Sequence, residues 1–237
     1  MKINRVTMTG ADDSIKAEML EPLTARYPFV EWGVLLSRSS EGRVRFPSRN
    51  WLGHFGDTYS QKWQLAGHLC GSWVRDLVLH GEMTCFVERP EFMSYFPRIQ
   101  LNFHGDRHEP HKLFWERLRV HPDKQFIFQL DHINDDLLQR ALEKKINAVA
   151  FFDISHGAGI VPESWPAPIP GVYCGYAGGL GPENIRDQLK KLEQVVGDTT
   201  IWIDMESSLR SVAIGKNFFD LYKCEKVLEI VMPWIKI

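Results

Sequence analysis

Acidic and imidazole side chains stand at the ends of short apolar segments in this chain of 237 residues. Asp153 follows the run Ala-Val-Ala-Phe-Phe, and Asp204 and Glu206 come at the end of a second apolar run. His68 lies within a third, Gln-Leu-Ala-Gly-His-Leu-Cys. Carboxylates and imidazoles are the groups that most often transfer protons in enzymes. The sequence therefore predicts acid–base chemistry, provided that the fold brings these segments together.

Apolar segments alternate with segments of helical spacing along the chain, a pattern typical of parallel strands joined by helices. We expect eight strands, over 5–9, 29–37, 64–70, 98–103, 125–131, 148–153, 172–176 and 200–205. One helix should begin near Pro182, another near Asn134 as its N-cap, and a last one should cover 220–231. The long connections 38–63 and 81–97 should form loops or short helices over one end and are candidate lids.

The composition restricts the class of protein. The chain has 28 basic and 30 acidic residues without a long run of either sign, so nothing favours a nucleic acid or an anionic membrane as partner. We expect a small anionic or neutral partner and no cofactor, and the oligomeric state stays open. With 44% hydrophobic residues, 1–237 can form a single domain.

The cysteines and the amino-terminal residues indicate a compartment. The four cysteines are far apart, without a CxxC pair, and should be reduced thiols: Cys70, Cys85, Cys174 and Cys224. The first residues lack the apolar stretch of a signal peptide, and no later stretch is long enough to span a bilayer. We therefore expect a cytoplasmic protein.

Three motifs in the second half of the chain carry a resemblance. They are 148–153 followed by Gly157-Ala-Gly159, then 177–184 (Ala-Gly-Gly-Leu-Gly-Pro-Glu-Asn), then 201–204 (Ile-Trp-Ile-Asp) followed by Ser207-Ser208. In order and spacing they resemble phosphoribosylanthranilate isomerase. The first half is similar more loosely, through Met8-Thr9-Gly10, Gly33, Arg43 ahead of Pro47, and Gln100 to Gly105. The resemblance implies an α/β fold of the (β/α)₈ TIM-barrel type, a closed eight-stranded parallel sheet ringed by helices, rather than an open doubly wound sheet.

The resemblance also implies a reaction, the Amadori rearrangement of an aminoaldose phosphate. An acid protonates the ring oxygen, and a base removes a proton from the carbon beside the resulting imine. Asp153 corresponds to the acid. The cysteine that is the family's base corresponds to Thr9 or, with a shift of one, Met8, and neither can accept a proton near neutral pH. We take His68 as the second catalytic candidate, with His156, Asp131 and Glu206 as alternatives. Asp153 could instead cap a turn, and His68 could be a packed core imidazole.

Phosphate in these barrels is bound by backbone amides after strands seven and eight. The corresponding residues here are Gly178, Gly179, Ser207, Ser208 and Arg210. Arg43 matches the family's anthranilate-binding arginine, and Arg45 is close enough to replace it. Other polar strand ends complete the predicted substrate site: Thr9, Asn102, Asp131, His156, Asp204 and Glu206.

Two other functions stay open. The missing cysteine and the altered loop after strand eight favour a non-catalytic descendant that binds a phosphorylated ligand or a protein. A different barrel enzyme, an aldolase or a hydrolase, is the third hypothesis. Lys124 and Lys145 precede strands rather than end them, which disfavours a Schiff-base aldolase. The cluster of His104, His108 and His111 suits zinc or iron by residue type, but Pro110 interrupts a helix through it, so no metal site is predicted.

Overall fold

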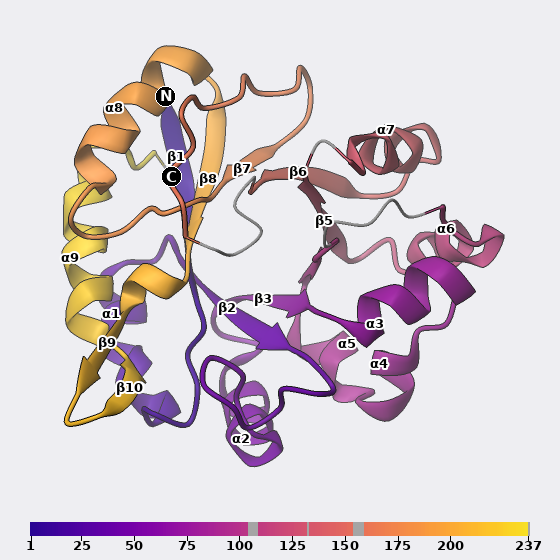
Figure 1. Ribbon diagram of the computed structural model, residues 1–237, viewed down its shortest axis with the longest axis horizontal. Helices are drawn as coiled ribbons and strands as arrows, with labels where there is room; N and C mark the ends of the chain where they lie inside the picture. Colours follow the sequence, from indigo (N-terminus) through magenta and orange to yellow (C-terminus); the bar gives the residue numbers. More distant parts are fainter. Residues whose placement is uncertain (104–108, 132, 154–158, 237) are drawn as a thin grey trace.

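A computed structural model describes residues 1–103, 109–131, 133–153 and 159–236. Eight parallel strands form a closed barrel, in which each strand pairs with the next and β8 pairs with β1 (Figure 1). The strands are β1 (Lys2–Thr9), β2 (Val30–Leu36), β3 (Gln64–Leu69), β4 (Arg98–Leu101), β5 (Gln125–Leu130), β6 (Ala148–Phe152), β7 (Cys174–Tyr176) and β8 (Thr200–Met205). The predicted (β/α)₈ barrel is confirmed.

Helices surround the barrel, with α8 and α9 side by side on one flank (Figure 1). The α-helices are α1 (Glu21–Arg26), α2 (Arg49–Tyr59), α3 (Ser72–Arg75), α4 (Thr84–Glu88), α5 (Glu91–Tyr95), α6 (Lys112–Arg119), α7 (Asp135–Glu143), α8 (Ile185–Val196) and α9 (Leu221–Val231). A π-helical turn, η2 (Asp76–His80), continues α3, and 3₁₀ turns occur at η1 (Ala17–Leu20), η3 (Ser207–Leu209) and η4 (Met232–Trp234). The three helices that the sequence predicted are α7, α8 and α9. Asp220 caps α9, since its carboxylate accepts from the backbone N–H groups of Tyr222 and Lys223.

Two separate apolar layers stabilise this arrangement. The larger one lies between the strands and the helices, and the smaller one fills the inside of the barrel with Ile127, Val149, Phe151 and Trp202. Alternate residues of a strand face opposite sides of the sheet, so each strand contributes to both layers. Gly175 makes room for the Trp202 ring, because a Cβ there would lie 2.1 Å from the ring atom Cε2.

A buried ion pair lies inside the barrel at the amino ends of the strands. Glu31 accepts from Arg98 Nη1 at 2.6 Å and from the Thr7 hydroxyl at 2.8 Å, and Arg5 Nε lies 3.5 Å from its other oxygen. The Arg98 guanidinium lies over the Trp202 ring, 4.5 Å from its centroid. This end of the barrel is therefore filled, and it leaves the carboxyl ends of the strands for a pocket.

The segment after β8 forms a hairpin that the sequence did not predict. β9 (Arg210–Ala213) pairs antiparallel with β10 (Lys216–Phe219). Its turn places Ile214 at φ +50° and Gly215 at φ +71°, and a β-branched residue is rare at positive φ, which explains why no turn signal was visible. In the described part of the chain, no helix is both long and apolar enough to cross a bilayer.

Candidate active site

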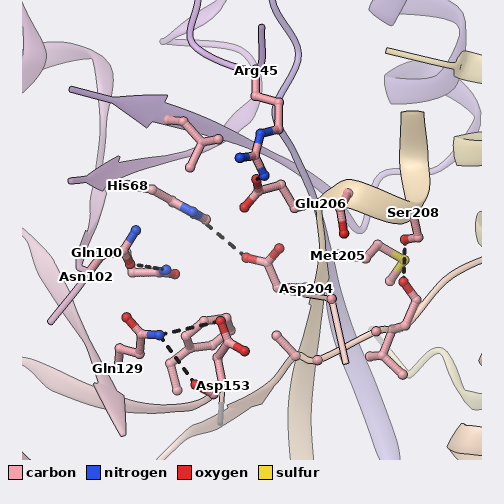
Figure 2. Close-up of a pocket in the computed structure, with 18 of the residues that line it drawn as sticks. Arg45, His68, Gln100, Asn102, Gln129, Asp153, Asp204, Met205, Glu206 and Ser208 are labelled. Atoms are coloured by element: carbon pink, nitrogen blue, oxygen red, sulfur yellow. Dashed lines mark hydrogen bonds and ion pairs between the residues drawn. The ribbon is translucent and has the colours of Figure 1, made fainter. Parts of the chain in front are cut away.

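The carboxyl ends of the strands surround a cavity of about 220 Å³ (Figure 2). Predicted site residues from β3 and β8 and from the segments after β4, β6, β7 and β8 line it together. They are His68, Asn102, Asp153, Gly178, Gly179, Asp204, Glu206, Ser207 and Ser208. Arg45 and Phe46, from the segment 38–63, also line the cavity, whereas the described lining includes no residue of 81–97. Of the two candidate lids, only the first is therefore placed at the mouth.

Asp204 lies in the middle of the cavity, between His68 and Thr9. The Thr9 hydroxyl, at the end of the neighbouring β1, donates to Asp204 Oδ1 at 2.9 Å. The His68 imidazole points across the cavity toward the same carboxyl, with Nε2 at 3.8 Å from Asp204 Oδ2 (Figure 2). Gly33 permits this arrangement, because a Cβ there would lie 2.1 Å from Thr9 Oγ1 and 3.1 Å from His68 Cε1.

Burial sets the protonation of these groups. It lowers the pKa of His68 to about 3, with the Arg98 guanidinium as a lesser cause, so this imidazole is neutral at neutral pH. Burial raises the pKa of Asp204 well above its ordinary value, and nearby carboxylates, Glu206 first among them, add to the rise. It also raises the pKa of Glu206. A carboxyl with a raised pKa exchanges its proton closer to neutral pH, as an acid or base catalyst requires.

A hydrogen-bonded chain of polar side chains forms the wall of the cavity at β3 and β4. Gln100 Nε2 donates to Asn102 Oδ1 at 2.6 Å, and Asn102 Nδ2 donates to Cys70 Sγ at 3.1 Å. The Cys70 thiol donates to the His68 carbonyl oxygen at 3.5 Å. Burial raises the pKa of Cys70 to about 12, so this side chain remains a thiol and is no substitute for a catalytic cysteine.

Asp153 follows β6 and lies on the same side of the cavity as Gln129 of β5 (Figure 2). Gln129 Nε2 donates to the Asp153 backbone oxygen at 3.4 Å and to its Oδ2 at 3.5 Å. The amide thus holds both the main chain and the carboxyl of Asp153 at the point where β6 ends. This contact orients the predicted acid toward the cavity.

Arg45, and not Arg43, reaches the cavity. The Arg45 guanidinium pairs with Glu206 Oε1 at 2.5 Å, whereas Arg43 lies outside the lining. Arg45 has φ +75°, which L-residues rarely adopt, and Asp12 fixes this conformation by accepting from the Arg45 N–H at 2.6 Å. Of the two arginines that the sequence offered, the structure places Arg45 at the cavity.

Gly178, Gly179, Ser207 and Ser208, together called the glycine–serine wall, line the side of the cavity at β7 and β8. Both glycines have positive φ, +119° and +59°. The segment 159–161 packs closely on them, since a Cβ on Gly179 would lie 2.6 Å from the backbone nitrogen of Val161. Any side chain at Gly179 would therefore displace this loop, whether or not the wall binds an anion.

Three other predicted residues have different contacts, and one lies outside the described residues. Arg210 donates to the Gly10 carbonyl oxygen, to Asp12 Oδ2 and to Asn217 Oδ1 at 2.5–2.8 Å, so these bonds hold two loops together, and its side chain lies outside the cavity lining. Asp131 Oδ1 accepts from the backbone N–H groups of Ile133 and Asn134 at the start of α7, outside the cavity lining. Thr9 also lies outside the lining and reaches the cavity only through Asp204. His156 belongs to the undescribed residues.

The histidine cluster considered for metal binding is described only at His111. Its Nδ1 accepts from the Leu113 N–H at 3.3 Å and so caps α6. His104 and His108 lie outside the described residues. Within 1–103, 109–131, 133–153 and 159–236, no three His, Cys, Asp or Glu side chains are placed to hold a metal ion.

Comparisons by sequence find no match, either to a model of a known protein family or to a protein of curated function. Comparison of structures finds phosphoribosyl anthranilate isomerase from Thermotoga maritima, with a TM-score of 0.55 and 14% identity over 98% of this chain and 100% of that chain. TrpF from Jonesia denitrificans has a TM-score of 0.59 and 10% identity, covering 97% of each chain. The chain has a phosphoribosylanthranilate isomerase-like barrel fold.

This fold is shared with enzymes of other names. The 3-hexulose-6-phosphate synthase from Salmonella typhimurium has a TM-score of 0.54 and 10% identity over 99% of this chain and 100% of that chain. At these identities the likeness concerns the fold, and function has to be argued from the cavity.

Two lining residues that the sequence analysis missed are Gln100 and Gln129. Both lie inside strands rather than at their ends, and attention to strand ends alone excluded them. The period of two could have shown them, because Gln100 is two residues before Asn102 and faces the same side of β4. Gln129 follows Ile127, which fills the barrel interior, at the same spacing.

Proposed function

We propose that the cavity binds a small phosphorylated sugar or a related anion and acts on it as an aldose–ketose isomerase. One observation carries this proposal: the acid–base groups Asp153 and Asp204 and the glycine–serine wall line the same cavity. Two of the structures with this fold are named for phosphorylated sugars, as isomerase and as synthase. A chemistry that moves protons on a sugar phosphate needs both features within one cavity.

Asp153 is the proposed acid that protonates the ring oxygen and opens the sugar. The carbon beside the resulting carbonyl or imine then loses a proton to a base. A neutral imidazole whose pKa is about 3 is a weak base, which argues against His68 in this role. The Asp204 carboxyl acts as a base in its ionised form, and it is then the stronger base because burial raises its pKa. We therefore assign the base to Asp204, positioned by Thr9, and leave His68 as the imidazole that contacts it.

Loss of either carboxyl tests the catalytic part of this proposal. Asp153→Asn and Asp204→Asn should each lower turnover of an aldose phosphate about 100- to 10,000-fold, because each removes a positioned proton-transfer group. A panel of aminoaldose and aldose phosphates, assayed for ketose formation, supplies the measurement. Complementation of a tryptophan auxotroph that lacks the isomerase tests the family's own substrate, for which we expect little or no growth, since Thr9 replaces the cysteine. Turnover that survives both variants would contradict the assignment.

A second function, binding without catalysis, is favoured by one specific contact. The hydroxyl of Thr9, which stands where the family has its cysteine, already donates to Asp204 and lies outside the lining. Such a descendant would be stabilised by phosphate or a phosphosugar without turning any over. A rise in melting temperature with phosphate, combined with no turnover across the panel, would support this second function over the first.

A further inference from the structure

We infer that the side of the cavity opposite the glycine–serine wall binds a neutral group rich in hydrogen-bond donors, such as a polyhydroxyl chain, and rejects a carboxylate. The inference rests on the proposed function, because it concerns the remainder of a ligand whose phosphate lies at the glycine–serine wall. Figure 2 shows the residues concerned on the side away from Ser208. We call them the amide wall: His68, Gln100, Asn102 and Gln129.

Gln129 presents an acceptor to this side of the cavity. Its Nε2 donates to two oxygen atoms of Asp153, so the amide nitrogen is directed toward that residue. The remaining Oε1 is buried and has no hydrogen-bond partner among the residues that the structure describes. A buried carbonyl oxygen without a partner costs about 1 to 3 kcal/mol. A ligand donor that meets Oε1 would recover that free energy.

Gln100 presents a second acceptor, and its orientation follows from its neighbours. The Cys70 thiol donates its single hydrogen to a carbonyl oxygen, so Cys70 Sγ accepts from Asn102, and Asn102 Oδ1 accepts from Gln100 Nε2. Gln100 Oε1 is thereby left as an acceptor, buried and without a partner in the described part of the chain. His68 Nε2 is a third buried atom without a hydrogen-bond partner in the described residues, and it donates or accepts according to the tautomer of the imidazole. Two unpartnered acceptor oxygens on one wall indicate a ligand that carries polar hydrogens.

The polar groups of the cavity leave no free cation for a second anion. Asp153, Asp204 and Glu206 direct three carboxyls to it, and Arg45 is the one basic side chain among its described lining residues. The Arg45 guanidinium already pairs with Glu206 at 2.5 Å. A ligand carboxylate would therefore meet the acceptor oxygens of two amides without a free cation, and contacts between acceptors are repulsive. The ligand is anionic at the glycine–serine wall only.

A cavity without a free cation differs from the site of a barrel that binds an anthranilate group. An aromatic carboxylate would need a free arginine, and the arginine that reaches the cavity is neutralised by Glu206. A hydroxylated or aminated chain supplies donors to Gln100 and Gln129 instead. The substrate class is therefore a phosphorylated polyhydroxy compound without a carboxylate.

A matched pair of ligands tests the inference. Sorbitol 6-phosphate and 6-phosphogluconate have the same chain length and differ at one end, where a CH₂OH replaces a carboxylate. Calorimetric titration of the full chain should give at least about 10-fold tighter binding of sorbitol 6-phosphate, equivalent to 1.4 kcal/mol. Inorganic phosphate is titrated as the probe of the glycine–serine wall alone, and gluconamide and gluconate form a second pair without phosphate.

Two variants locate the effect. Gln129→Met removes the Oε1 acceptor. It should lower the affinity for sorbitol 6-phosphate about 3- to 10-fold and leave the affinity for inorganic phosphate unchanged. Glu206→Gln releases Arg45 and should raise the affinity for 6-phosphogluconate, relative to that for sorbitol 6-phosphate, by about 10-fold. Gln139→Met is the matched control, since this exposed amide of α7 contacts Glu143 on the surface and should leave every affinity unchanged.

The outcomes separate this inference from the proposed function. Equal binding of the two hexose derivatives, or preference for the acid, overturns the amide-wall inference and leaves the phosphate site standing. Selective binding of gluconamide over gluconate without any binding of phosphate supports the amide wall and contradicts the proposed function. Absence of binding by all five compounds contradicts both.

Discussion

The two ends of the barrel bury charge in different ways. At the amino ends of the strands, Glu31 is paired with Arg98 and accepts from Thr7, so its charge is compensated within the fold. At the carboxyl ends, Asp204 and its neighbouring carboxyls share a cavity in which the one described guanidinium contacts Glu206. The comparison shows that burial by itself does not indicate function. What indicates function is a buried charge whose compensation is incomplete.

The two ends are also coupled through their electric fields. Arg98 contributes to the lowered pKa of His68, and Glu31 contributes to the raised pKa of Asp204. Both effects act in the direction that keeps the cavity groups uncharged. The filled end of the barrel therefore supports the chemistry of the open end without contributing a residue to its lining.

The largest effect should follow from breaking the ion pair at the filled end. Arg98→Met removes the nearer of the two cations beside the buried Glu31 carboxylate and should lower the free energy of unfolding by about 3 to 5 kcal/mol. Urea unfolding at pH 7 measures this loss. The double variant Arg98→Met/Glu31→Gln removes the charge as well and should recover most of it. A loss below about 1 kcal/mol for the single variant would mean that the two ends do not differ as described.

The next effect concerns the neutral imidazole of the cavity and appears at acid pH. The pKa of His68 is about 3 in the folded state and near 6.5 when unfolded, so the unfolded state binds an extra proton between these values. The neutral His68 makes its full contribution to stability above pH 6.5. This contribution decreases as the pH drops, and at pH 4 it is smaller by about 3 kcal/mol. His68→Gln should remove this acid sensitivity, as followed by urea unfolding from pH 4 to 7. The exposed His80→Gln is the control, and an unchanged pH profile in His68→Gln would refute the prediction.

A smaller effect should come from Asp204, with the opposite pH dependence. Its pKa is raised on folding, so the folded state holds a proton that the unfolded state has lost, and stability falls as the pH rises above the ordinary carboxyl value. Asp204→Asn keeps the acceptor for Thr9 and should stay within about 1 kcal/mol of wild type at pH 4. The variant should then gain stability relative to wild type as the pH increases to 8. Asp187→Asn, on the surface of α8, serves as control; a relative loss at pH 8 would show that the Asp204 carboxylate is stabilising.

The smallest effect should come from a substitution in the glycine–serine wall that leaves the fold of this wall intact. Ser207 is exposed at the mouth, so Ser207→Ala should change the free energy of unfolding by less than about 0.5 kcal/mol. It should lower the affinity for inorganic phosphate about fivefold, the equivalent of one lost hydrogen bond. Calorimetry measures the change, with Ser94→Ala of α5 as control. Unchanged phosphate affinity in Ser207→Ala would remove this serine from the anion site.

Local patterns in the sequence were sufficient for the strands and for much of the cavity lining, whereas the closure of the sheet into a barrel followed from the resemblance of the motifs. Strand periodicity and strand-end polarity predicted that His68, Asp153 and Asp204 share one end of the fold, and the structure brings them together. Whether they catalyse a reaction stays a prediction. The period of two, applied further along β4 and β5, would have added Gln100 and Gln129.

The remaining site residues could not be predicted, since their contacts join segments far apart in the chain. Arg210 pairs with Asp12, 198 residues away, and its side chain lies outside the cavity lining. The choice between Arg43 and Arg45 depends on the positive φ of Arg45, held by the same Asp12. No local pattern encodes either contact.

The closure of the barrel has a consequence for the order in which the protein is made. β1 pairs with β2 on one side and with β8 on the other, and Ile3 also forms a bridge with Ile235. Ribosomes release the amino-terminal strand first, so one edge of β1 waits for a partner until residues 200–205 have been synthesised. During that interval the edge is open to strands of other chains. Rapid completion of synthesis, or a chaperone that covers this edge, would then determine how much of the protein reaches its closed form.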